Sequence, residues 1–290
     1  MSPLRRGTTA AVVALLASTL LPRAARAQQE SAAAAMPRPE SDPPRPIEVT
    51  VPGLPRSPTW TQGRTFGATR VWLLDPGEQE AEAWYSARVH HNGVAGDVRH
   101  LWQIEYMIGV APHVQLDVYF NYAHDKESGF HIEGAQIEGR FALGRRYGDI
   151  WGNPALYVEW HPQTRGPNRG ELRLLVGGQI LSPRLYGAIN PFWEQNLDAG
   201  ADGKFSADRE IGASAAIGYA VVPARLSVGA EIKAAADQQD GKSYKGVAAL
   251  GPTVWLNLLN GHLRFTATAL FGATRRSDSF YPVFVLAVHP

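Results

Sequence analysis

The sequence predicts an all-β fold, an antiparallel transmembrane β-barrel of about 12 strands preceded by a disordered, proline-rich arm. Three observations predict this fold: an export signal at the start of the chain, alternation of apolar and polar residues through most of the remainder, and confinement of charges to one face of the alternating segments. Most of these segments have about 10–14 residues, which suits a membrane-spanning strand better than a soluble one.

The composition excludes several kinds of site. The chain has 290 residues, no cysteine and a formal net charge of +1. The absence of cysteine excludes a disulfide scaffold, a cysteine-ligated zinc or iron–sulfur site and a cysteine nucleophile. A net charge close to zero gives no general attraction to nucleic acid, so no nucleic-acid partner is expected. We also expect no cofactor and no metal site.

The first 27 residues have the three parts of a secretory signal peptide. Arg5 and Arg6 form the basic region, 10–21 is apolar, and Ala25-Arg26-Ala27 is a cleavage site of the A-x-A type. Cleavage removes four arginines and no acid, so the 28 basic residues fall to 24 against 27 acidic ones, a net charge of −3. No other segment has 18 consecutive apolar residues, which argues against a helical membrane span.

Residues 28–60 differ in composition from the rest of the chain. They contain eight prolines and a run of alanines at 32–35, a composition that favours extended or disordered chain. We predict a spacer here, with a periplasmic tether or partner motif as the alternative, and we assign 61–290 to the barrel.

Alternation with a period of two predicts the strands. In the clearest segment, 98–110, Val98, Trp102 and Val110 share one face with other apolar residues, and Arg99 and Glu105 lie on the opposite face. Strands are expected at 78–89, 98–110, 113–124, 131–143, 154–161, 170–181, 185–196, 208–221, 224–236, 244–257, 262–273 and 279–289. Connections are mostly short at one end and longer at the other, as in outer-membrane barrels, with 144–153 as the exception.

The polar face carries a charge in almost every segment, and we expect that face to line the lumen. A soluble periplasmic β-domain would also alternate, but lipid specifically excludes charge from the centres of the outward face. The predicted lumen-lining residues are Glu82, Arg88, Arg99, Glu105, Asp117, Glu138, Arg140, Glu159, Glu171, Arg173, Glu194, Glu210, Glu231, Lys233 and Arg264. Glu80 and Arg225 fall on the same face, and Glu133 and Arg209 are exceptions on the lipid face near strand ends.

Aromatic residues near strand ends fit the same interpretation. Tyr122, Trp160, Trp193 and Tyr219 lie on the apolar face, where aromatic girdles meet the membrane interface, although ordinary packing would place aromatics there too.

Several short strings resemble one family of membrane barrels. They are Asp75-Pro76-Gly77-Glu78 with Glu80, Glu82 and Trp84-Tyr85 after it, Trp102–Tyr106 before Ala111-Pro112, Pro154–Trp160, and Gly251-Pro252-Thr253. Together they resemble the phenol-degradation (meta-pathway) outer-membrane channels over about 75–290. The resemblance implies a transport or channel role and names no substrate. The chain departs from many outer-membrane barrels because its last aromatic residue is Phe284 rather than the terminal one.

Two further site hypotheses come from serine and histidine. Some outer-membrane barrels of this size are lipases with a Ser–His–acid site on the lipid-facing rim. Ser86 and Ser214 face the lumen by parity whereas His100 faces lipid, so no catalytic residues are predicted. A metal site would require convergence of the histidines at the loop ends, which are His90, His91, His124, His131 and His161. Their spacing follows no ligand pattern, so scattered rim histidines are expected.

Together, these patterns predict a porin-like barrel in the outer membrane of a Gram-negative bacterium. The expected role is a channel or transporter for a small solute, and the alternatives are a non-conducting structural or adhesive barrel and, less favoured, an outer-membrane lipid hydrolase. The expected partners are outer-membrane lipid, the small-molecule solute and the barrel insertion machinery.

Overall fold

The computed structural model describes residues 57–58, 60–61, 63–90, 98–164, 166–198, 208–238 and 244–290. The predicted signal peptide and nearly all of the proline-rich arm lie outside these residues. Among the described residues, no helix has the length and hydropathy to cross a membrane.

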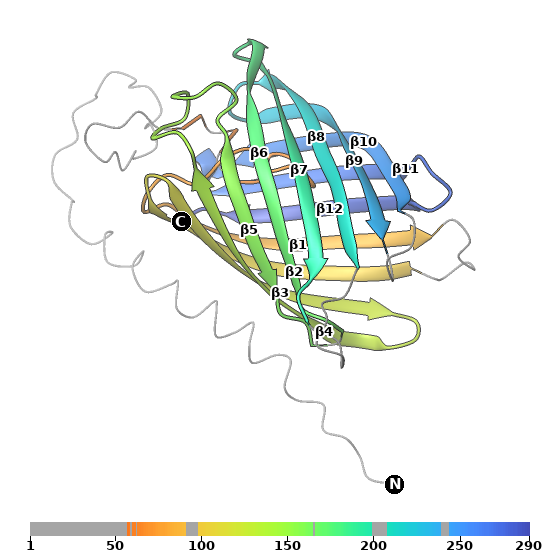
Figure 1. The fold of residues 1–290 in the computed structure, drawn as a ribbon. Coiled ribbons are helices and arrows are strands. Elements are labelled where there is room, and N and C mark those ends of the chain that lie inside the picture. Colours follow the sequence, from red (N-terminus) through yellow and green to blue (C-terminus); the bar gives the residue numbers. More distant parts are fainter. Residues whose placement is uncertain are drawn as a thin grey trace, which may run out of the picture. The chain divides into compact units, whose positions relative to one another are not determined.

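The described residues form twelve antiparallel strands that close into a barrel, which confirms the predicted fold (Figure 1). Each strand pairs with its neighbours in sequence, and β1 closes the barrel against β12. The strands are β1 Gln79–His90, β2 Val98–Ala111, β3 Val114–Asp125, β4 Gly129–Ala142, β5 Ala155–His161, β6 Arg169–Ser182, β7 Leu185–Asn196, β8 Arg209–Val222, β9 Leu226–Gln238, β10 Lys245–Leu258, β11 Leu263–Gly272 and β12 Asp278–Val288.

The two ends of the barrel differ in their connections. At one end β2, β6 and β8 pass to the next strand through two or three residues, and β10 does so through the short 3-10 helix Leu259–Gly261. We call this the turn end and the other the loop end. The connection 143–154 is the long one at the turn end, and it adjoins β5, which has only seven residues. Gly177 of β6 donates its backbone N–H to the Gly152 carbonyl at 2.7 Å, so this connection pairs with β6 beyond the start of β5.

The outer surface of the wall is apolar. Large apolar side chains project outward at alternate positions along the strands, and Ile104, Phe120 and Ile189 are each about half exposed. The inward positions between them are buried and largely polar. Trp160, Trp193 and Tyr219 are among the exposed aromatics, on the face predicted for them.

A segment that precedes β1 fills the turn-end half of the lumen. It comprises the described residues between Ser57 and Asp75, and we call it the plug. Its hydrogen bonds reach side chains of β1, β2, β3, β4, β7, β8, β9 and β11, which only a chain inside the barrel can contact together. The barrel wall therefore begins at Gln79, and most of the described residues between 61 and 78, which the sequence assigned to the barrel, belong to the plug.

The plug is a loop whose two ends meet. Ser57 donates its backbone N–H and its hydroxyl to the carboxylate of Asp75, at 3.2 and 2.9 Å. Next to this closure, Gly77 donates to the Gly109 carbonyl at 2.7 Å, and Gly109 donates to the Glu78 carbonyl at 3.0 Å. A Cβ atom on Gly109 would lie 2.2 Å from the Asp75 carbonyl oxygen, so the base of the plug needs a glycine at this place in β2.

This contact predicts that Gly109→Ala loosens the plug while the wall stays folded. Overpacking against backbone costs about 1–3 kcal/mol, so trypsin cleavage after Arg64 and Arg70, followed by mass spectrometry, is expected to accelerate roughly tenfold or more. The matched control is Gly246→Ala in β10, where the nearest atom to the new Cβ is 4.0 Å away. Equal cleavage rates in the two variants, both migrating as folded barrels on unboiled gels, would contradict the close contact at Gly109.

Candidate solute pathway through the lumen

The predicted lumen-lining residues fall into two groups by burial. One group is buried, in large part around the plug, and the other is partly exposed to the lumen. The buried group is Glu82, Glu105, Asp117, Glu138, Arg140, Glu159, Glu171, Glu231 and Arg264. The partly exposed group is Arg88, Arg99, Arg173, Glu194, Glu210 and Lys233.

Two arginines of the plug pair with carboxylates of the wall. The Nη2 atom of Arg70 donates both to Glu105 Oε1, at 2.7 Å, and to the Tyr119 hydroxyl, at 2.9 Å. Arg64 lies 3.2 Å from Glu82 and 3.3 Å from the second oxygen of Glu105, with its guanidinium 3.3 Å from the centroid of the Trp84 ring. Both arginines and both glutamates are buried. The plug therefore supplies cations to Glu82 of β1 and Glu105 of β2, whereas Glu80, also buried in β1, pairs with Arg264 of β11 at 2.7 Å.

Arg140 of β4 joins the plug to a second pair of acids. Its guanidinium lies 2.8 Å from Asp117 Oδ2 and also pairs with Glu138. The remaining Nη1 donates to the carbonyl of Trp72 at 3.3 Å. The same cation thus neutralises wall acids and satisfies a carbonyl of the plug.

Wall side chains also satisfy the irregular backbone of the plug. Asn190 accepts the Arg70 N–H at 2.7 Å and donates to the Arg70 carbonyl at 2.9 Å, as a neighbouring strand would. Glu231 accepts the successive N–H groups of Gly67 and Ala68, the second at 2.7 Å. Buried backbone polar groups need such partners, so these polar positions in the wall hold the plug in place.

An aromatic cluster packs one side of the plug against β5–β8. Trp60 stacks on Tyr186 with ring centroids 4.3 Å apart, and Phe66 lies 5.8 Å from the same ring. Tyr147, from the connection 143–154, meets Trp60 and Trp72 edge-on at 6.2 and 5.8 Å. Burial raises the pKa of Tyr147 to about 12, so its phenol stays neutral at physiological pH.

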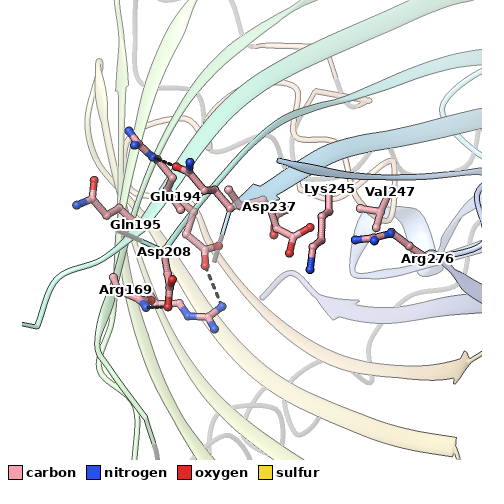
Figure 2. A pocket seen from close by; sticks show the side chains of 12 residues that line it. Arg169, Glu194, Gln195, Asp208, Asp237, Lys245, Val247 and Arg276 are labelled. Carbon is pink, nitrogen blue, oxygen red and sulfur yellow. Dashed lines mark hydrogen bonds and ion pairs between the residues drawn. The ribbon is translucent and has the colours of Figure 1, made fainter. Parts of the chain in front are cut away.

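The loop-end half of the lumen contains open cavities. A cavity of about 320 Å³ is lined by Trp84, Arg88, His161 and Lys233, among other residues. A second cavity of about 650 Å³ lies toward the loops and shares Arg169 and Glu194 with the first (Figure 2). Its lining contains the four bases Arg169, Arg209, Lys245 and Arg276 and the four acids Glu194, Asp208, Glu210 and Asp237. This balanced lining suits small polar solutes of either charge sign.

The strand register creates a continuous row of acids across seven strands. From β3 to β9, each strand places one acid directly opposite the acid of the next: Asp117, Glu138, Glu159, Glu171, Glu194, Glu210 and Asp237. We call this set the acidic row. It starts near the turn end, beside the plug, and ends near the loop end, where Asp237 faces Lys245. Directly opposed like charges repel, so the row requires counter-cations along its length.

Three assignments from the sequence are wrong. Arg209, expected on the lipid face, lines the larger cavity beside Glu210. Glu133, expected on the lipid face, turns inward because β4 has a β-bulge: Asn121 pairs with Gly134 and Tyr122 with Ile132, leaving Glu133 between them. Glu133 pairs with Arg99 and lines the smaller cavity. Arg225, expected on the inward face of a strand, lies exposed in the turn before β9.

The described histidines of the loop end do not converge. His90 lies 2.6 Å from Asp278, and His131 has Ser128 and the Gly129 carbonyl as its neighbours. His124 adjoins His100, with ring centroids 6.1 Å apart. His161 is buried on the inward face of β5, and His91 lies outside the described residues.

The plug residues of this site were missed at the sequence level. Arg64, Arg70 and Trp72 lie in a stretch without strand alternation, and their partners are far away in the sequence, as Arg64 and Glu105 show with a separation of 41 residues. The sequence does contain one signal for them. The inward face of the strands carries more acids than bases, and the stretch before Asp75 contains two arginines that can pair with the surplus acids.

Comparison with known proteins shows the fold. No family model matches the chain, and no curated protein matches it. The chain is similar to the NanC porin, with 10% identity, a TM-score of 0.51, and 73% of this chain and 98% of that one covered. It is similar to an outer membrane channel from Pseudomonas putida F1, with 10% identity, a TM-score of 0.55, and 76% and 97% covered. The predicted location in a Gram-negative outer membrane agrees with these neighbours.

The ion pairs of Arg70 predict that Arg70→Met releases the plug. Breaking a buried ion pair costs about 3–5 kcal/mol, so the population of the state with the plug released is expected to rise at least roughly 100-fold. Because the chain has no cysteine, a single Thr69→Cys reports opening through maleimide labelling, and Thr69 is fully buried.

The control in the same Thr69→Cys background is Arg184→Met, which removes an exposed arginine in the turn between β6 and β7. It is expected to label at the rate of the parent. Equal labelling of the Arg70→Met and Arg184→Met proteins would show that the pair with Glu105 does not hold the plug.

Proposed function

We propose that this protein is an outer-membrane channel for a small polar solute, with the plug as its gate. One observation carries the proposal: the polar lumen is open from the loop end inward and is closed by a segment that is not part of the wall. A barrel closed by its own wall side chains would need no separate segment. Its twelve strands lie between 8-stranded barrels, which side chains fill, and 16-stranded porins, which leave an aqueous channel.

The contacts of the plug suit a gate. They comprise ion pairs and hydrogen bonds to side chains rather than strand pairing with the wall, so the barrel keeps its complete backbone ladder when the plug leaves. Once the plug leaves, water can hydrate Glu82 and Glu105, and this hydration offsets part of the free energy lost with their ion pairs. The sequence resemblance to phenol-degradation channels gives a more specific proposal of the same kind, and a channel role is also what the names of the porin and of the Pseudomonas putida protein state.

A second candidate is a non-conducting barrel that acts through its outer loops. The observation that favours it is the number of plug contacts, which extend to eight strands and include buried charges. A catalytic role has less support, because Ser214 is engaged with the plug, donating its hydroxyl to the Ala68 carbonyl at 3.2 Å.

A reversible disulfide between the plug and the wall tests whether the plug is the gate. A Cβ on Gly67 would lie 2.9 Å from the Cβ of Thr268, close enough for a disulfide after a small adjustment in Gly67→Cys/Thr268→Cys. In planar bilayers we expect intermittent conductance steps from the parent protein, none from the oxidised double variant, and recovery on reduction. A variant lacking 57–74 is expected to stay open.

Each single-cysteine variant serves as a control, because it carries the same local change without the cross-link. Conductance of the oxidised double variant equal to that of the parent would show that the plug is not the gate. A folded 57–74 deletion variant that never conducts would favour the non-conducting barrel.

A further inference from the structure

In the middle of the acidic row, a histidine lies beside two of the carboxylates. Glu159 and His161 of β5 and Glu171 of β6 are all buried, with exposures of 5, 9 and 7%. One ligand atom from each of them lies within 4.8 Å of those from the other two. We propose that these three side chains bind a divalent transition-metal ion such as Zn²⁺.

The strand geometry explains why the three side chains meet. Glu159 and Glu171 are directly paired across β5 and β6, so their side chains leave the wall next to each other. His161 is two residues after Glu159 and therefore shares its inward face. Two carboxylates and an imidazole form a ligand set that suits Zn²⁺ and similar ions, whereas Mg²⁺ prefers oxygen ligands alone.

The charges around the group leave room for a cation. Arg173 pairs with one oxygen of Glu171, and the ion pair of Glu159 is with His161, whose Nε2 lies 3.1 Å from a Glu159 oxygen. Despite that short distance, Nε2 is buried and makes no hydrogen bond with acceptable geometry. Metal binding requires His161 to release its Nε2 proton, after which two opposed carboxylates face one guanidinium, and Nε2 is an atom through which an imidazole binds a metal.

Gln136 orients the imidazole from the far side. Its side-chain Nε2 lies 3.2 Å from Nδ1 of His161, and its Oε1 accepts from Gln103 Nε2 at 2.8 Å. Metal binding requires both amides to be turned over, which exchanges their N and O atoms: Gln136 then accepts from Nδ1–H, and Nε2 of His161 presents its lone pair to the ion. Such an orienting partner is typical of histidines that bind metals.

An ion can reach this group from the loop end. His161 lines the smaller cavity, which shares Arg169 and Glu194 with the larger cavity near the loops. The other close group of acids in the row, Glu105, Asp117 and Glu138, differs in this respect. Arg70 and Arg140 already pair with its carboxylates beneath the plug, so a metal would compete with two buried guanidiniums there.

Calorimetry with Zn²⁺ on the full-length mature protein, folded in detergent, tests this site. We expect one ion per barrel, an affinity at least tenfold weaker for His161→Asn and Glu159→Gln, and a loss of about 10–100-fold for Gln136→Leu. His131→Ala removes a histidine near the same end outside the group and is expected to bind like the parent. Co²⁺ in place of Zn²⁺ is expected to give an absorption band that depends on His161.

Three results would overturn the site: no Zn²⁺ binding by the parent protein, binding that His131→Ala abolishes and His161→Asn leaves intact, or binding of Mg²⁺ with equal affinity. Unboiled gel migration establishes that each variant is folded before titration. The 57–74 deletion variant separates this inference from the gate, because the three ligands belong to the wall and its Zn²⁺ affinity is expected to persist whether or not it conducts.

Discussion

The pairing of buried wall carboxylates with arginines of the plug is the interaction on which the rest of this structure depends. Lipid outside the barrel directs every charged side chain of the strand centres inward. Ionised carboxylates away from water require partners, since an unpaired buried charge costs several kcal/mol. Arg64 and Arg70 provide those partners for Glu82 and Glu105. The plug thus makes burial of these two acids possible, and the acids in turn hold the plug in the lumen.

The same constraint applies to backbone polar groups. The plug runs through the lumen without joining the sheet, so its N–H and C=O groups need acceptors and donors from side chains. Asn190, Glu231 and Thr266 supply them, the last by donating to the Arg64 carbonyl. The wall positions at this depth are consequently buried and polar together, a combination that a core packed only from apolar side chains would not show.

The strands could be predicted from sequence because their cause is local. Alternation placed β1 at 78–89 and the structure has Gln79–His90, and the agreement is similar around the barrel. The plug could not be predicted in this way, because its conformation is set by contacts from up to 202 residues away, as between Arg64 and Thr266. The face of Glu133 was also misjudged, since a single extra residue in β4 reverses parity without changing composition.

The acidic row could not be predicted from alternation, because its prediction needs the register between neighbouring strands. The sequence predicted that all of these acids except Asp237, which fell in an expected loop, face inward, but the cross-strand pairs decide that they lie side by side. This arrangement gives the two halves of the lumen different electrostatics. Beside the plug, Asp117 and Glu138 face Arg140 in a dry environment where attraction is strong, whereas Glu210 and Asp237 line a cavity where water screens them.

Withdrawal of the plug would remove this difference, because water would then enter the turn-end half. Glu82 and Glu105 would lose their counter-cations and change from partners of the plug to the lining of a pore. The acidic row would then continue the negative lining from these residues to the loop end. In the proposed channel, the residues that close the lumen would therefore also determine its charge after the plug withdraws, and closure and selectivity would have a common physical origin in the excess of acids on the inward face.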